Sequence, residues 1–231
     1  MSNKGRTVTG KNSVAYNKKE SAKTWLIALF FALAITAAAF IPMLNNEFVN
    51  WDDDRYITDN MLLKDISATT LAGIFNPTTG IVNYGYTPLV MATFAIEKQL
   101  WGLDPLPYHI TNLLLHLLCV SLVIVLMRLL KLRVEAVMLV GVLFGIHTMR
   151  VESVAWISER KDLMFTLFSL ASMNLYLLSE MHPQKQKRYL LAALLLFVFA
   201  LLSKIQAVAL PLTLLCLDYY RGKIGSIADF R

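Results

Sequence analysis

Charged residues are scarce in this sequence of 231 residues. Asp, Glu, Lys and Arg make up only 16% of it, whereas hydrophobic residues make up 56%. A soluble globular domain normally has about a quarter of its residues charged. The composition therefore excludes an ordinary soluble domain and indicates a membrane protein. Together with the apolar runs described below, it predicts an all-α integral membrane protein with about six transmembrane helices.

Cysteine is also scarce. The two cysteines, Cys119 and Cys216, lie far apart within apolar runs, so the sequence predicts neither a disulfide framework nor a zinc site. We expect both to pack as small apolar residues. Nucleic acid is not an expected partner, because the basic residues behind the net charge of +6 are scattered between apolar segments instead of forming one patch.

Long apolar runs divide the chain into five parts. Residues 1–24 form a basic tail, and residues 25–44 form a first transmembrane helix, since this uncharged run is longer than the apolar region of a signal peptide. An outer loop follows at residues 45–109, five further transmembrane helices at residues 110–220, and a cytoplasmic tail at residues 221–231. The five predicted spans are residues 110–127, 134–149, 163–181, 189–203 and 205–220.

Two short helices are predicted in the outer loop. Asp65 or Ser67 is suited to cap a helix that ends at Phe75, before Pro77. A second helix is expected at residues 89–101. We expect both helices to lie at the membrane surface, because they carry apolar stripes.

The distribution of charge predicts the orientation. If the N-terminal tail is cytoplasmic, 15 of the 22 basic residues face the cytoplasm and 11 of the 16 acidic residues face the opposite side. This arrangement agrees with the positive-inside rule. We therefore expect a multi-pass protein with both termini in the cytoplasm, which in a bacterium would lie in the inner cell membrane.

Three consecutive carboxylates, Asp52, Asp53 and Asp54, mark the outer loop. Two interpretations of this triplet remain open. Repulsion between adjacent like charges favours a solvated loop at the membrane surface. Alternatively, one carboxylate acts as a general base while its neighbours tune its pKa or hold a cation.

A second charged segment, residues 147–162, is expected on the same outer side. Its cations are Arg150, Arg160 and Lys161. Because basic residues are disfavoured on this side, they require an explanation. One is local pairing with the acidic residues of the segment. The other is that these cations, with His147 and with Lys204 from the next outer turn, bind the phosphate of a lipid-linked substrate.

Helical geometry and burial give two further expectations. If residues 147–162 are helical, Glu152, Trp156 and Arg160 share one face. Three polar residues lie within or beside the apolar runs: Asn112, His116 and Asn174. We expect these three to form hydrogen bonds between helices and to take no part in chemistry.

Several blocks of the sequence resemble one family of membrane glycosyltransferases. The blocks are VESVAWISERKD at residues 151–162, HITNLLLHLL at residues 109–118, NWDD at residues 50–53, YGYTPL at residues 84–89, and residues 210–220. Over residues 48–222 the chain resembles the membrane half of the O-mannosyltransferase-like proteins that carry tetratricopeptide repeats. The animal members of that family are the transmembrane O-mannosyltransferases acting on cadherins.

The resemblance implies a C-type glycosyltransferase fold and a sugar donor carried on polyprenyl phosphate at the outer face. It implies that the general base is Asp52 or Asp53, that the outer cations stabilise the leaving phosphate, and that the acceptor is a hydroxyl of a protein or glycan. A single attack assisted by this base predicts inversion. The resemblance assigns no cofactor, and a divalent cation at the triplet is an open alternative. Further pocket candidates are Asp54, Glu152, Tyr84 and Tyr86.

The chain departs from the family pattern in three ways. Relatives usually have His-Pro where this chain has Thr148 after His147, and Pro or Glu where Ile205 follows Lys204. They also continue with further spans and then the repeats. This difference implies that the acceptor-binding half is absent, truncated or supplied by a partner chain.

Two functions follow from the sequence. The first is a glycosyltransferase, or its N-terminal catalytic half, that transfers a sugar from a polyprenyl-phosphate carrier to an acceptor hydroxyl. The alternative is a noncatalytic membrane subunit or scaffold that keeps the fold and binds lipid phosphate or a protein partner. Membrane lipids are partners in either case. A transporter is disfavoured, because the charges lie near the membrane surface and away from the midplane.

Overall fold

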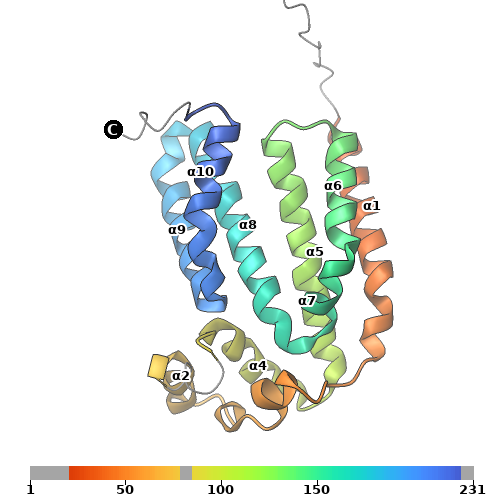
Figure 1. Ribbon diagram of the computed structural model, residues 1–231, viewed down its shortest axis with the longest axis vertical. Helices are drawn as coiled ribbons and strands as arrows, with labels where there is room; N and C mark the ends of the chain where they lie inside the picture. Colours follow the sequence, from red (N-terminus) through yellow and green to blue (C-terminus); the bar gives the residue numbers. More distant parts are fainter. Residues whose placement is uncertain (1–20, 79–84, 225–231) are drawn as a thin grey trace, which may run out of the picture.

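A computed structural model describes residues 21–78 and 85–224 of the protein. These residues form helices and turns without a strand, which confirms the all-α prediction. The bundle contains α1 (Ala22–Phe40), α5 (Pro105–Leu129), α6 (Val134–Ile146), α8 (Arg160–Met181), α9 (Gln186–Ser203) and α10 (Leu210–Tyr220). These helices run side by side, and both ends of the described chain lie at the same end of the bundle, which we call the terminal end (Figure 1).

Four helical segments are long and apolar enough to cross a membrane: Ala22–Asn45, Pro105–Leu129, Ile157–Met181 and Pro183–Ser203. A fifth candidate is α6 followed by Thr148–Ala155, whose axes are bent by 51° at His147. The predicted sixth span, Ile205–Tyr220, is apolar but shorter. The described residues therefore contain four or five candidate spans, and a sixth is not shown.

The helix ends follow from local sequence. The hydroxyl of Ser21 accepts a hydrogen bond from the Thr24 amide (3.2 Å) and caps α1, and Asp104 caps α5 through the Leu106 amide (3.1 Å). Each cap satisfies an amide that has no partner within its helix. Pro211 lies in the first turn of α10, where a missing amide hydrogen costs no helical bond.

Small and polar residues set the packing of the bundle. A Cβ atom at Gly145 of α6 would lie 2.0 Å from Thr36 Oγ1 of α1, so glycine permits the close approach of these helices. His116 Nε2 lies 2.8 Å from the carbonyl oxygen of Gly145, and the Asn174 amide donates to the carbonyl oxygen of Leu122 (3.1 Å). These contacts confirm the predicted hydrogen bonds between helices.

The predicted loop helices form as α2 (Ala68–Phe75), capped by Ser67, and α4 (Pro88–Trp101). They cover one end of the bundle, which we call the cap end (Figure 1). Their position at the membrane surface stays a prediction, while part of the apolar surface of both helices packs against the bundle. Ile74 and Phe94 pack in one apolar core with Ile157 and Met164, because burial against the bundle removes these side chains from water.

Candidate active site

Alternating charges meet at the cap end. The Nζ atom of Lys161 lies 2.9 Å from a carboxylate oxygen of Glu159 and 3.7 Å from one of Asp52. Lys204, between α9 and η7 (Ile205–Ala209), forms an ion pair with Asp162, and its Nζ atom lies 3.9 Å from Glu159. We call these five residues the charge cluster. Their side chains are 13% to 30% exposed, so a ligand can reach them.

The local-pairing interpretation is therefore right for Lys161 and Glu159. It does not account for the other contacts, because Lys161 also reaches Asp52 in the first loop and Asp162 pairs with Lys204 from a later turn. Asp52 and Lys161 were predicted to lie on one side of the membrane protein, and they are in contact.

A surface pocket of about 660 Å³ adjoins the charge cluster. Asp162 belongs to both, and the Ser153 hydroxyl on the pocket wall donates a hydrogen bond to it (3.2 Å). The remaining polar wall contains His147, Arg150 and Glu152, and the apolar wall contains Val140, Leu143, Phe144 and Met149. The volume lies within the range of small-molecule sites, and the two kinds of wall suit a ligand with a charged head and an apolar tail.

Arg150 supplies the guanidinium of this pocket. The group lies over the ring of Phe144, 4.6 Å from the ring centroid. Across residues 21–78 and 85–224, no carboxylate forms an ion pair with Arg150. This cation is therefore placed to meet an anionic ligand without first releasing an acidic partner.

Asp53 has a different position from its neighbour Asp52. It is completely buried, and its carboxylate accepts hydrogen bonds from the Val49 amide (2.9 Å), the Ser158 amide (3.0 Å) and the Ser158 hydroxyl. Of the two predicted candidates for the general base, Asp53 is therefore closed to solvent and already hydrogen-bonded. Its carboxylate connects the first loop to the segment before α8 through hydrogen bonds.

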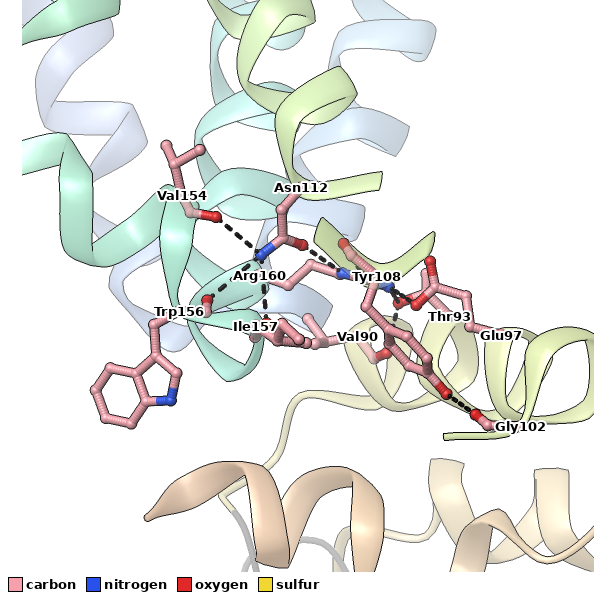
Figure 2. Close-up of polar contacts among 10 residues, drawn as sticks. All are labelled: Val90, Thr93, Glu97, Gly102, Tyr108, Asn112, Val154, Trp156, Ile157 and Arg160. Atoms are coloured by element: carbon pink, nitrogen blue, oxygen red, sulfur yellow. Dashed lines mark hydrogen bonds and ion pairs between the residues drawn. The ribbon is translucent and has the colours of Figure 1, made fainter. Parts of the chain in front are cut away.

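Arg160, which was predicted to bind the donor phosphate, is also completely buried. Its donors reach Asn112 Oδ1 (2.8 Å), Thr93 Oγ1 (3.1 Å), the carbonyl oxygen of Tyr108 (3.1 Å) and the carboxylate of Glu97 (Figure 2). A phosphate would have to displace these partners in a buried environment. Arg160 therefore joins α4, α5 and α8, and we call it with Asn112 and Glu97 the arginine hub.

The segment before α8 is not one continuous helix. A short helix, α7 (Val151–Ala155), is followed by Trp156, whose backbone is extended. The prediction that Glu152, Trp156 and Arg160 share one helical face is therefore wrong. The side-chain amide of Asn112 donates hydrogen bonds to the carbonyl oxygens of Val154 (3.3 Å) and Trp156 (3.4 Å) (Figure 2). These bonds satisfy carbonyl groups that the break leaves without helical partners.

The acidic triplet does not converge on one point. Asp54 accepts a hydrogen bond from the Thr58 hydroxyl (3.4 Å), while Asp52 faces Lys161 and Asp53 faces Ser158. In the part of the chain that the structure describes, no three His, Cys, Asp or Glu side chains are grouped to hold a metal ion.

Of the two tyrosine candidates, Tyr86 does not line this pocket. The Tyr86 hydroxyl donates to the carbonyl oxygen of Phe75 (3.2 Å) and so holds the end of α2. Tyr84 lies outside the described residues.

Tyr56 lies beside the charge cluster, in the turn η2 (Asp54–Thr58). The Lys161 Nζ atom lies 5.1 Å from the centroid of its ring. Burial raises the pKa of Tyr56, while the Lys161 cation acts in the opposite direction and the Asp52 carboxylate adds to the rise. The phenol therefore stays neutral near pH 7 and presents its ring to the cation.

Sequence reasoning missed Glu97 and Ser158. Arg160 lies 63 positions after Glu97, so no local spacing signals their contact. One signal was available, because Glu97 falls on the same face of α4 as the buried Val90 and Phe94. An acidic residue on an apolar face indicates a buried partner. Nothing in the sequence near Ser158 predicts its bond to Asp53.

The fold and the site together define a multi-pass helical membrane protein with a charged pocket at one end of its bundle. Comparison with known proteins adds a family relationship. The chain is 30% identical over 214 residues to the protein O-mannosyl-transferase Tmtc2 of Drosophila melanogaster, 31% over 197 residues to Tmtc1 of the same species, and 28% over 159 residues to human TMTC2. These matches cover 86%, 79% and 66% of the chain.

The chain is a distant homologue of the TMTC protein O-mannosyl-transferases over most of its length, which confirms the predicted resemblance. It spans about a fifth of the length of the curated relatives it matches, 19% to 22% in these three. No protein-family model matches the chain. No solved structure matches it.

Proposed function

We propose that the chain is a glycosyltransferase, or the N-terminal catalytic half of one, that transfers a sugar from a polyprenyl-phosphate carrier to an acceptor hydroxyl. The observation that carries the proposal is the 3.7 Å approach of Asp52 to Lys161, because it pairs a reachable carboxylate with a cation beside the pocket. The homology with protein O-mannosyl-transferases supports mannose as the sugar and a protein as the acceptor.

Asp52 is the proposed general base. Its side chain is 27% exposed, whereas Asp53 is buried and already accepts three hydrogen bonds. The Asp52 carboxylate takes the proton of the acceptor hydroxyl while the hydroxyl oxygen attacks the anomeric carbon. The bond from that carbon to the phosphate oxygen breaks on the opposite face, and its electron pair leaves with the polyprenyl phosphate. One displacement of this kind inverts the anomeric configuration.

The proposed ligands of the donor phosphate are Arg150, Lys161 and Lys204. The Arg150 guanidinium has no carboxylate partner among the described residues and can donate two hydrogen bonds to one phosphate. Charge that develops on the leaving phosphate is stabilised by these fixed cations. His147 lies on the same pocket wall, and the apolar wall would hold the first units of the prenyl chain.

The proposed topology places the cap end outside and both termini in the cytoplasm. The positive-inside rule supports this orientation, since the terminal end carries most of the basic residues. The short segment Ile205–Tyr220 completes six crossings in this proposal. Its five 3-10 residues and eleven α-helical residues rise roughly 26 Å. That length is close to the hydrocarbon thickness of about 30 Å.

A second candidate is a noncatalytic membrane subunit that binds lipid phosphate or a protein partner. The burial of Asp53 and Arg160 favours this candidate, because it closes two of the predicted site residues to a ligand. The two candidates differ in turnover, because both bind the donor and only the enzyme transfers the sugar.

The test uses the purified chain, radiolabelled polyprenyl-phosphate mannose and a panel of protein acceptors. Asp52→Asn is expected to lower the rate of transfer by about 10²- to 10⁴-fold, since it removes the base, while donor binding is retained. Asp59→Asn is the matched control, because it removes one charge from the same loop without touching the charge cluster. Equal rates in the parent and Asp52→Asn would reject Asp52 as the base. Donor binding without any transfer by the parent would favour the noncatalytic subunit.

A further inference from the structure

A second, smaller groove lies at the terminal end, far from the charge cluster. It has a volume of about 250 Å³ and runs between the start of α1 and the end of α5. Leu26 and Leu29 of α1 and Ile124 and Val125 of α5 form its apolar walls. Arg128 is its charged residue, and the pocket wall contains no carboxylate.

Arg128 differs from Arg133 and Arg221, which lie at the same end of the bundle. Arg133 lies 3.4 Å from Glu135, and Arg221 pairs with Glu180. No carboxylate within residues 21–78 and 85–224 forms an ion pair with Arg128. Its guanidinium instead lies over the ring of Trp25, 5.2 Å from the ring centroid, and this contact holds the cation beside the groove.

The surroundings of Arg128 favour an anion. Lys23 precedes the groove in the first turn of α1, and Lys131 and Arg133 follow it after α5. The first turn of α1 also contributes the positive end of its helix dipole. An anion at the mouth of the groove would therefore meet the positive end of the α1 dipole together with the side-chain cations at the end of α5, whose full charges exceed the partial negative charge of the α5 C-terminus.

We propose that this groove binds one anionic glycerophospholipid. The head-group phosphate would accept hydrogen bonds from the Arg128 guanidinium, and an acyl chain would lie along the apolar walls formed by α1 and α5. Trp25 suits the boundary between head group and chain, since its ring is apolar with one polar edge. The apolar walls argue for a lipid over a free phosphate, which would leave them exposed. This site is independent of the proposed transferase activity.

The test counts lipids bound to the detergent-purified chain by native mass spectrometry, with dioleoyl phosphatidylglycerol and dioleoyl phosphatidylcholine added in turn. Arg128→Gln is expected to weaken phosphatidylglycerol binding by about five- to tenfold and to leave phosphatidylcholine binding unchanged. Arg221→Gln is the matched control, because it makes the same charge change at a residue that pairs with Glu180 and does not line the groove. Val125→Trp, which fills the groove, is expected to weaken binding without changing the charge.

Two results would overturn the proposal. Equal phosphatidylglycerol binding in the parent and Arg128→Gln would remove the role of the cation. Full displacement of the lipid by soluble glycerol phosphate would show a simple anion site that does not use the apolar walls. Loss of transferase activity in any of these variants has no bearing on the result, since the readout is lipid binding.

Discussion

Arg160 and Lys161 are consecutive residues with opposite surroundings. Arg160 is completely buried in the arginine hub, whereas the Lys161 side chain is 15% exposed and belongs to the charge cluster. A cation-rich segment therefore contains both a residue that holds the fold and a residue that can meet a ligand. Burial and partners separate the two roles, although the sequence shows only two neighbouring positive charges.

Asp52 and Asp53 repeat this contrast in the first loop. Asp53 faces Ser158 in the interior, and Asp52 faces Lys161 at the surface. Adjacent side chains in a helical turn point about 100° apart, so one can enter the core while its neighbour stays reachable. We infer that Asp53 and Arg160 position the loop and α8, and that this positioning brings Asp52 and Lys161 together.

The largest expected effect comes from breaking the arginine hub. Arg160→Met leaves the Glu97 carboxylate buried without its cation and should lower the free energy of unfolding by about 3–5 kcal/mol. Lys161→Met removes a partly exposed ion pair and should cost less than about 1 kcal/mol. The measurement is unfolding of both variants in mixed micelles, followed by circular dichroism.

A double variant distinguishes the loss of this ion pair from a general loss of folding. Arg160→Met combined with Glu97→Leu replaces both charges by apolar groups and should recover much of the stability lost in Arg160→Met alone. Similar losses in the two single variants would contradict the distinction between a buried hub and an accessible cluster.

The two carboxylates offer a smaller test of the same contrast. Asp53→Asn replaces one carboxylate oxygen by an NH2 group, which cannot accept the hydrogen bond that a backbone amide donates at this position. The unsatisfied amide should lower the free energy of unfolding by about 1–3 kcal/mol. Asp52→Asn should change the free energy of unfolding by less than about 1 kcal/mol. Denaturant titrations of the two variants provide the comparison, and a larger loss in Asp52→Asn would reverse our assignment of roles.

The smallest expected effect concerns Lys98, which joins α4 to the first loop. Its Nζ atom donates to the carbonyl oxygens of Ile57 (2.6 Å) and Thr58 (3.1 Å), and burial lowers the pKa of Lys98 below its usual 10.5, with the Asp59 charge opposing. Between the lowered pKa and 10.5 the unfolded chain binds more protons, so stability should rise with pH in that alkaline window. Lys98→Met should flatten the rise, and an unchanged slope would exclude Lys98 as its source.

Much of the fold could be predicted from the sequence. Apolar runs and capping residues located the bundle helices and both loop helices within a few residues, because helix length and cap chemistry are local properties. The predicted placement of Asp52 and Lys161 on one side of the membrane agrees with their 3.7 Å separation, although it did not predict their contact.

The burial of the site residues could not be predicted in the same way. The bond between Asp53 and Ser158 spans 105 positions, and the pair Arg160 and Glu97 spans 63. Such contacts depend on how the helices pack against one another, and this packing cannot be predicted from the spacing of residues in the sequence. The break at Trp156 was missed for the same reason, since the Asn112 amide that satisfies its carbonyl comes from α5.

The most direct test of the proposed site is the dissociation constant for polyprenyl-phosphate mannose. We predict that Lys161→Gln and Lys204→Gln each raise it by about tenfold or more, because each removes a charge-assisted contact to the phosphate. Lys223→Gln, whose lysine pairs with Glu180 at the terminal end, should leave it unchanged. Equal dissociation constants for the parent and all three variants would contradict the assignment of the charge cluster as a donor site.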